Sequence, residues 1–230
     1  EKYMATVIFR ADGSSNFARG KRWGYFPSAS IGWTISNEDF MAGAADIIDF
    51  LKIRASWGQN GNCSIGNFQY LSTIAFDVSN GYYFAADKKT QTVGGYADIL
   101  ANPDVTWETS EQLNIGLDAR FARGRLGLAF DWYQKMTRDW LLTAPIPGVY
   151  GLNAPAVNGG DVKNSGVELS LTWDDFVGDF RYGISLNGSY NKNEVTRIAN
   201  TEGIIHGASN VLSQGTTEMY RAQVGYPLGY

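Results

Sequence analysis

The side chains that most often carry out catalysis or bind metals are few in this sequence and stand apart from one another. The only histidine, His206, lies in the polar segment EGIIHGASN with Ser209 nearby, but no nucleophile elbow and no orienting acid accompany it. The only cysteine, Cys63, has no paired base and can form no internal disulfide. The segment ADGSSN at 11–16 lacks the ligand spacing of a calcium loop. We therefore predict no catalytic residue, no metal site and no cofactor.

Exposed aromatic side chains are the other candidates for a binding function. The segment NGYYFAADKKTQTVGGYADI is unusually aromatic for a connection, and WLLTAPIPGVYG resembles it in this respect. Such side chains could stack on sugar rings or contact a partner protein, although packing of a long loop is the more ordinary role. The predicted substrate- or partner-contact residues are Tyr82, Tyr83, Phe84, Tyr96, Trp140 and Tyr150.

Composition excludes several classes of protein. The net charge is −4, only 18% of the 230 residues are charged, and no basic run is present, so nucleic-acid binding is not expected. No stretch of 18 consecutive apolar residues occurs, which excludes a transmembrane helix. The first residues lack a signal-peptide pattern and the last residues stop inside a strand-like segment, so we expect a part of a longer protein.

The elements that must position these residues are β-strands with two unlike faces. Over 23–34, apolar and aromatic side chains alternate with Ser, Gly and Thr, which is the period of a strand. The same alternation recurs over 51–58, 112–121, 126–133, 166–173 and 180–191, and more weakly near 3–10 and 218–230. The pattern predicts an all-β fold of about eight antiparallel strands.

The predicted connections alternate in length. Tight turns follow the strands that end near residues 121 and 173, and 35–46 is a short-to-medium connection with room for a helical turn. Long segments rich in Gly, Asn and Pro occupy roughly 59–106, 138–160 and 192–217. Long loops at one end and tight turns at the other are typical of an outer-membrane barrel.

Two solvents could face the apolar side of these strands. In a soluble sandwich it packs against a second sheet; in a barrel it meets lipid, which excludes charge and places aromatic side chains at the headgroup level. The strand lengths, near ten residues, suit an apolar band about 25 Å tall. We therefore favour a transmembrane barrel. The predicted lipid-interface aromatics are Trp23, Trp33, Trp57, Phe121, Trp132, Trp173, Phe180 and Tyr190.

The opposite face would enclose a wet lumen. Its Ser, Asn and Gly side chains are too small to fill a dry interior, and its charges could line a substrate path, contact a plug or pair across strands. The predicted lumen-lining residues are Lys52, Arg54, Asn114, Asp118, Arg120, Glu168, Arg181 and Asn187. Pro27 does not fit this pattern, because it has no N–H for the ladder, and we expect it at a bulge or an edge position.

An ordered series of segments resembles one known family. RADGSSNFARGKRWGYFPSASIGWTISNEDF, LKIRASWGQNGN, WETSEQLNIGLDARF, DWYQKMTRDWLL and NSGVELSLTW are together similar to the barrel of SusC/RagA TonB-dependent outer-membrane transporters, over roughly 3–193. The resemblance implies a 22-stranded barrel, of which this chain supplies about a third from the later half. All of 1–230 would belong to this single barrel domain, with the plug and signal peptide elsewhere.

The resemblance also implies a function. Family members import glycans or peptides through the outer membrane of Gram-negative bacteria, draw on the TonB energy-coupling complex through a plug, and pair with a SusD-like surface lipoprotein. The alternatives that the residues leave open are a soluble extracellular carbohydrate-binding β-sandwich and a passive porin-like barrel that closes on these strands. None of these readings predicts an enzyme.

Overall fold

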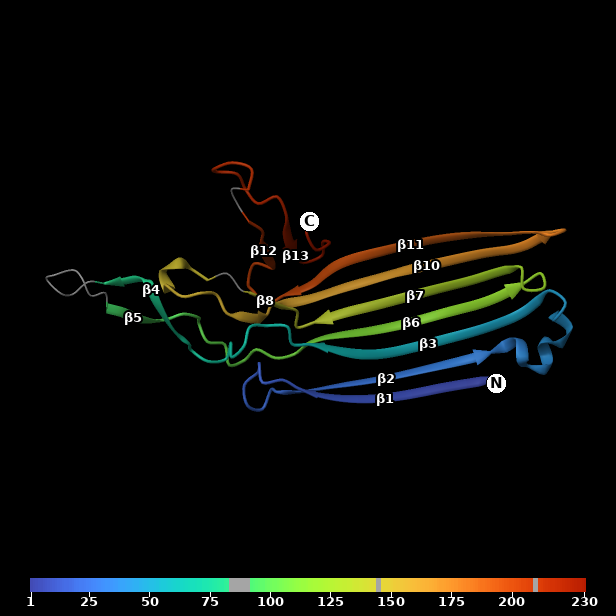
Figure 1. The fold of residues 1–230 in the computed structure, drawn as a ribbon, viewed down its shortest axis with the longest axis horizontal. Helices are drawn as coiled ribbons and strands as arrows, with labels where there is room; N and C mark the ends of the chain where they lie inside the picture. The colour runs from blue at the N-terminus through green and yellow to red at the C-terminus, as the bar shows by residue number, and fades with distance from the viewer. Residues whose placement is uncertain (83–91, 144–145, 209–210) are drawn as a thin grey trace.

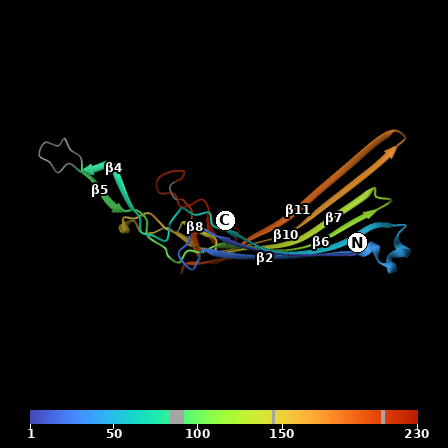
Figure 2. The ribbon, with the colours of Figure 1, turned by 60° about the horizontal axis from the view of Figure 1, so that its bottom comes forward.

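The structure, a computed structural model, describes residues 1–82, 92–143, 146–208 and 211–230, with the side chains of 77–82 left out. Its main body is one seven-stranded antiparallel sheet in the order β1-β2-β3-β6-β7-β10-β11 (Figure 1). The strands are β1 (Tyr3–Gly13), β2 (Trp23–Thr34), β3 (Ile48–Asn62), β6 (Glu108–Phe121), β7 (Leu126–Arg138), β10 (Gly160–Val177) and β11 (Phe180–Ile198). The sheet is bent, because β10 and β11 rise away from the plane of β1 and β2 (Figure 2).

Short connections lie at one end of the sheet, as predicted. The 3₁₀ turns η1 (Ile35–Asn37) and η2 (Asp39–Ala44) lie in the connection between β2 and β3, which confirms the helical turn expected over 35–46. Residues 122–125 join β6 to β7, and only Gly178 and Asp179 join β10 to β11. Gly178 has a φ of 59°, a left-handed conformation that glycine adopts without strain, so it suits this tight turn. We call this end the turn end.

The other end, which we call the loop end, carries the long connections. Between β3 and β6 the chain forms the hairpin of β4 (Ile74–Tyr82) and β5 (Thr92–Ala97), which stands well beyond the ends of the wall strands (Figures 1 and 2). Between β7 and β10 it forms β8 (Leu141–Thr143), η3 (Gly148–Tyr150) and β9 (Ala156–Asn158). After β11 come β12 (Ile204–His206) and β13 (Arg221–Gln223), which pair with each other.

Two sequence-based expectations about strand boundaries were wrong. Residues 218–230 do not form an eighth wall strand: within them only β13 is extended, and it pairs with β12 instead of the sheet. The wall strands are also longer than the alternation suggested, because β10 continues to Val177 and β11 to Ile198. The alternation breaks down there, since two acidic residues precede Phe176 and Val177 in β10, so the strands extend past the part that periodicity can detect.

Pro27 lies where it does not interrupt the sheet interior. It is opposite Phe9 on β1, but the pairing of β2 with β3 starts one residue later, at Ser28 and Gly58. The missing N–H of Pro27 therefore costs no hydrogen bond to β3.

Two buried clusters lie at the loop end, where side chains of the connections pack on residues of β2, β10 and β11. One cluster consists of Phe17, Phe26, Val105, Trp107 and Ala156, and the other of Val162, Val195, Ile198 and Ala222. In the wall itself large apolar side chains are exposed, among them Ile115 at 46% and Leu169 at 40%. The other sheets in the described part of the chain have two strands each, and none covers this face. The wall is therefore a single layer without a sandwich core. No helix among the described residues has the length and apolar character needed to cross a membrane.

Candidate functional site

The register of the sheet separates two faces along its whole width. Residues opposite one another across an antiparallel ladder share a face. One such row contains Ala5, Ile31, Ala55, Ile115, Trp132, Val167 and Tyr190. The next row, one residue away on every strand, contains Thr6, Ser30, Ser56, Asn114, Tyr133, Gly166 and Asn191. We call these faces the apolar face and the polar face.

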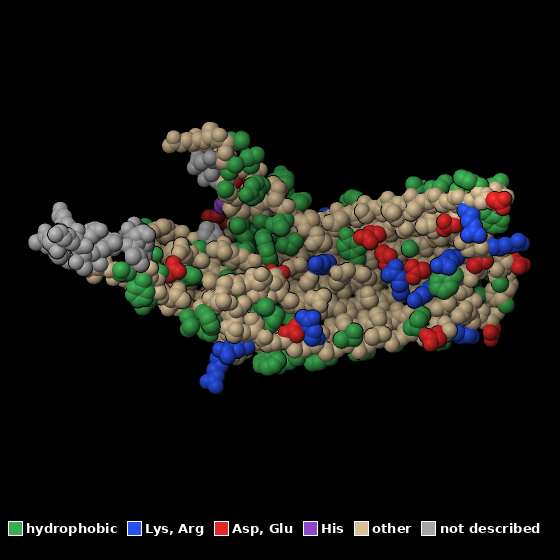
Figure 3. All heavy atoms as spheres, in the orientation of Figure 1, with side chains coloured by type: hydrophobic (Ala, Val, Ile, Leu, Met, Phe, Trp, Pro, Cys, Tyr) green, Lys and Arg blue, Asp and Glu red, His purple; other side chains and the backbone are tan. Residues whose placement is uncertain are grey.

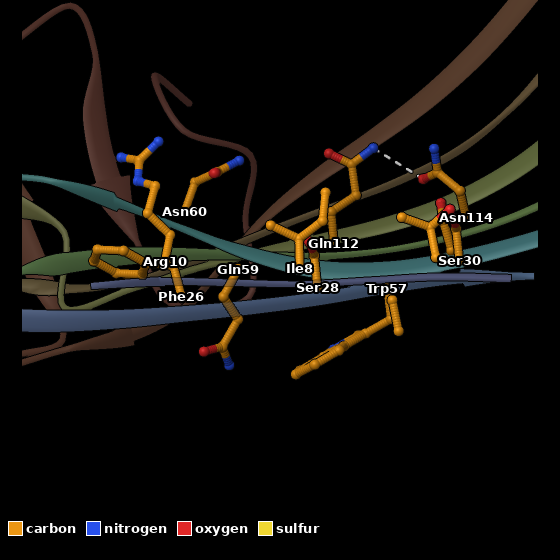
Figure 4. Close-up of a pocket in the computed structure, with 14 residues that line it drawn as sticks. Ile8, Arg10, Phe26, Ser28, Ser30, Trp57, Gln59, Asn60, Gln112 and Asn114 are labelled. Carbon is orange, nitrogen blue, oxygen red and sulfur yellow. Dashed lines mark hydrogen bonds between the residues drawn. The ribbon is translucent and has the colours of Figure 1, made fainter. Parts of the chain in front are cut away.

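The polar face has a hollow of about 430 Å³ over β1, β2, β3 and β6 (Figure 4). Uncharged hydrogen-bonding side chains supply most of its polar lining. They are Thr6, Ser28, Ser30, Ser56, Asn60, Gln112 and Asn114. Gln112 donates a hydrogen bond from Nε2 to Oδ1 of Asn114 at 2.9 Å, and both side chains point to the same side of the sheet. Trp57 and Gln59 point to the opposite side, so the indole does not enter the hollow (Figure 4).

A packed aromatic group bounds the hollow towards the loop end. Phe26 is only 4% exposed and packs edge-on against Trp107, with ring centroids 5.5 Å apart. The indole N–H of Trp107 donates to the backbone oxygen of Arg22 at 3.2 Å. The Arg10 guanidinium lies 5.9 Å from the centre of the Phe26 ring and is bonded to Asp12. This group fixes the loops against the polar face of the wall.

A charged cluster bounds the hollow towards the turn end. Arg54 on β3 contacts Asp118 on β6, with Nε and Oδ2 3.0 Å apart, and Asp131 on β7, with Nη2 and Oδ2 2.6 Å apart. In the register Lys52 is opposite Asp118 and Glu168 is opposite Asp131. Figure 3 shows acidic and basic side chains gathered over this middle part of the sheet.

All the residues predicted to line a lumen lie on the polar face, but they do not form one group. Lys52, Arg54, Asp118 and Glu168 belong to the charged cluster, and Asn114 belongs to the hollow. Arg120, Arg181 and Asn187 lie on the same face but outside both, with Arg181 beside the turn between β10 and β11.

The sequence-based set missed Asp131, Gln112 and the three serines of the hollow. Their alternation places them on the right face, but only the register, which the sequence does not give, shows that they meet.

The predicted lipid-interface aromatics all lie on the apolar face. Trp33, Phe121, Trp173 and Phe180 are near the turn end of their strands, Trp23 is near the loop end, and Trp57 lies between the middle and the loop end of β3. Trp132 and Tyr190 lie near the middle of strands that extend further than the alternation does. Their position at a headgroup layer remains a prediction.

Carboxylates hold some of these aromatic side chains at both ends of the apolar face. At the turn end Glu38 accepts hydrogen bonds from Tyr3 Oη at 2.6 Å, Trp33 Nε1 at 3.1 Å and Lys2 Nζ at 3.2 Å. These donors lower the pKa of Glu38, the Tyr3 bond most of all. At the loop end Glu111 accepts from Trp57 Nε1 at 2.9 Å and Arg138 Nε at 3.3 Å.

The predicted contact residues of the loops have different surroundings. Tyr83 and Phe84 lie outside the described residues, as does the side chain of Tyr82. Tyr96 on β5 is 51% exposed and Tyr150 in η3 is 58% exposed. Trp140 is half-buried against the cluster around Val195, which is a packing role.

His206 and Cys63 have separate surroundings in the described part of the chain. His206 Nδ1 lies 2.9 Å from Glu218 Oε1, but Ser209 falls outside the described residues. Cys63 is a half-buried free thiol at the edge of the cluster around Phe17. Among the described residues, no group of three or more His, Cys, Asp or Glu side chains is placed so that it could hold a metal ion.

These observations define a class of protein. A single antiparallel layer with one uncovered apolar face, one hydrated face and connections of unequal length is a section of a transmembrane β-barrel wall. The chain belongs to the TonB dependent receptor-like β-barrel family, whose model matches residues 2–228. Membership confirms the predicted fold class and the predicted outer-membrane location, and the family is one of receptors and not of enzymes.

Individual relatives agree with this assignment. TonB-dependent receptor P39 of Formosa agariphila is 36% identical over 204 residues, which are 88% of this chain and 19% of the relative. TonB-dependent receptor SusC of Bacteroides thetaiotaomicron is 31% identical over 231 residues, 98% of this chain and 23% of the relative. The RagAB peptide importer in its closed-closed state has a TM-score of 0.84 at 25% identity, covering 99% of this chain and 23% of its own. The chain thus spans about a fifth of the length of these relatives, and its resemblance to SusC/RagA proteins is confirmed.

Proposed function

We propose that this chain forms part of the wall of an active outer-membrane importer of glycans or peptides. In this proposal residues 1–230 belong to one barrel domain, a plug elsewhere in the protein connects it to the TonB complex, and a SusD-like surface lipoprotein covers the loop end. The predicted lumen-lining residues face the solute path, and the predicted aromatics of the apolar face meet the lipid.

One observation carries this proposal: the two faces stay distinct across all seven strands. From the row of Phe121 to the row of Ile115 and Trp132 this face is apolar yet uncovered, so it needs hydrocarbon against it. Polar residues such as Glu111 and Gln134 appear on it towards the loop end. The opposite face carries a hollow and a charged cluster, which need water or a solute.

The edges of the sheet support a larger barrel over a small one. Within the described residues β1 and β11 stand at opposite ends of the strand order and do not pair with each other. Unpaired strand edges are not tolerated in lipid, so further strands must flank both. This argues against a passive porin that closes on these strands. The uncovered apolar face argues against a soluble β-sandwich.

The loop end supports a partner at the cell surface. The β4–β5 hairpin stands beyond the wall (Figure 1). The exposed side chains of Tyr96 on β5 and Tyr150 in η3 belong to connections at this end. Exposed aromatic side chains commonly anchor protein interfaces. Similarity to a structure described as a peptide importer supports a transport role.

Uptake by cells tests the proposal. A strain that lacks the gene for the full-length protein is compared with the wild type and with a strain that lacks TonB, using labelled glycans and peptides. We expect both mutants to lose uptake of the same solute. Uptake that requires the full-length protein but persists without TonB would make the channel passive and refute active import.

A further inference from the structure

We propose that the hollow on the polar face binds an extended peptide through its main chain, with Gln112 and Asn114 as the principal contacts. This inference rests on the proposed function and narrows its substrate class. It starts from the bond between the two side chains, in which Gln112 Nε2 donates to Asn114 Oδ1.

The amide pair leaves an acceptor and several donors available at the hollow. A carboxamide has one carbonyl oxygen and two N–H donors. The bond between the two side chains uses the oxygen of Asn114 and one N–H of Gln112, so Gln112 Oε1, the second N–H of Gln112 and both N–H groups of Asn114 remain available. Side by side, an acceptor and a donor complement the N–H and C=O of a peptide main chain, as strands complement each other in a sheet.

The spacing of the wall fits a peptide that lies along the strands. Gln112 and Asn114 are two residues apart on β6, as are Ser28 and Ser30 on β2. Residues two apart on a strand are about 6.6 Å apart, and an extended peptide repeats its main-chain groups at the same interval. Successive main-chain groups of an extended peptide would therefore have the same spacing as the side chains of the hollow, so the peptide could bind without bending.

Charge and aromatic content favour the main chain as the ligand group. The one charged side chain at the hollow is Arg10, which is already bonded to Asp12. Its two aromatic lining residues offer no free ring, because Phe26 is buried and Trp57 points to the other side of the sheet. The lining thus lacks an exposed ring on which a sugar would stack, and it lacks a free charge that would select charged peptide side chains. Binding would tolerate many peptide sequences.

A pair of peptides tests this inference on the full-length wild-type protein purified in detergent. The first is a Ser-Gly hexapeptide with blocked termini, and the second is the same peptide with alternate main-chain nitrogens methylated. We expect methylation to weaken binding about tenfold, since each blocked N–H removes a hydrogen bond. Equal binding of the two peptides would overturn the inference without any change to the protein.

Variants then locate the contact. In Q112L/N114L the unmodified peptide should bind about tenfold more weakly, and methylation should cause little further loss. The matched control is Gln134→Leu, which changes the same side chain on the apolar face, opposite Leu113, and should bind as wild type. If methylation of the peptide lowers its affinity for the double variant and for the wild type by the same factor, the contact lies elsewhere and the inference fails.

A neutral oligosaccharide, maltohexaose, separates this inference from the proposed function. Energy-dependent uptake of the oligosaccharide, with binding that falls in Q112L/N114L, would overturn the peptide assignment and leave the importer intact. Absence of any TonB-dependent uptake would refute the importer itself. If neither peptide binds the full-length protein, the hollow is not open to peptides there, and the inference is overturned.

Discussion

Arg54 on β3 forms an ion pair with Asp131 on β7, although the whole of β6 lies between those two strands. The contact is possible because Gly116, the β6 residue opposite both, has no side chain in the way. Tyr133 crosses β10 in the same manner over Gly166 and donates to Asn191 on β11 at 3.1 Å. Side chains on the polar face thus lie flat against the wall and connect strands that are not neighbours.

The first prediction concerns this crossing. In Gly116→Ala the new methyl would lie 2.6 Å from both Arg54 Cζ and Asp131 Oδ1, so the guanidinium must move and Asp131 loses its partner. Leaving a largely buried carboxylate unpaired costs about 1–3 kcal/mol. We expect the full-length barrel to lose this much free energy of unfolding in denaturant titrations. Gly188→Ala on β11, where a methyl meets nothing within 4 Å, is the control; equal stability of the two variants would contradict the prediction.

The second prediction tests which face meets hydrocarbon. Ile115→Arg places a charge on the apolar face, where it should cost about 2–4 kcal/mol near the middle of a bilayer. Ser170→Arg, on the polar face of β10, should cost little. The measurement is the folded fraction of the full-length protein in outer membranes, read from its heat-modifiable migration in gels. A greater loss from Ser170→Arg would reverse the assignment of the faces.

The third prediction concerns pH at the loop end. His206 lies between Glu218, 2.9 Å from Nδ1, and Glu202, 3.7 Å from Nε2, with Arg221 beside Glu218. The hydrogen bond and charge of Glu218 raise the pKa of His206, and His206 lowers the pKa of Glu218. Protonated His206 therefore stabilises the folded state. This contribution is complete below the pKa of histidine in the unfolded chain, near 6.5, and it is lost as pH rises through the higher pKa of the folded protein.

Hydrogen exchange measures this effect. The ionised form of Glu218 also stabilises the folded state, and this contribution is lost as pH falls through the lowered pKa of Glu218. After correction for intrinsic rates, we expect protection of β12 and β13 to be greatest between about pH 5 and 6.5 and to decline towards pH 8. His206→Gln should remove the decline above pH 6.5. Protection that rises towards pH 8 in the wild type would contradict the pairing.

The fourth prediction separates the loops from the wall. Phe26→Ala removes a buried ring from the cluster of Phe17, Val105 and Trp107, which should cost about 3–5 kcal/mol. We expect limited proteolysis to cut within 63–107 while the β-sheet signal in circular dichroism is retained. Phe40→Ala, in the exposed turn η2, is the control and should leave 63–107 resistant. Loss of the sheet signal in Phe26→Ala would show that the wall depends on this cluster.

Much of the wall could be predicted from the sequence, because alternation reports a face directly. The apolar and polar faces of β2, β3, β6, β7, β10 and β11 agree with the period-two pattern, and the short turns lie where the strands stop. What failed was the end of the chain. Residues 218–230 are aromatic and Gly-rich enough to imitate a strand, but β13 pairs with β12, and further bonds tie the segment to the loop end of β11, where Val195 N donates to Tyr226 O.

The candidate site could be predicted only in part, for a physical reason. The sequence places Arg54 and Asp118 on one face, but the reach of Arg54 to Asp131 depends on the register and on a glycine in the strand between them. Likewise, nothing local in the sequence joins Phe26 to Trp107, which are far apart along the chain and meet only because the loops fold back.

Both buried clusters lie at the loop end, where side chains of the connections pack on Phe26 of β2, Val162 of β10 and Val195 of β11. Insertions and substitutions in 63–107 or 139–159 that spare these contacts need not alter the pairing of the wall strands. Evolution could therefore reshape this end of the sheet while the wall itself is inherited unchanged.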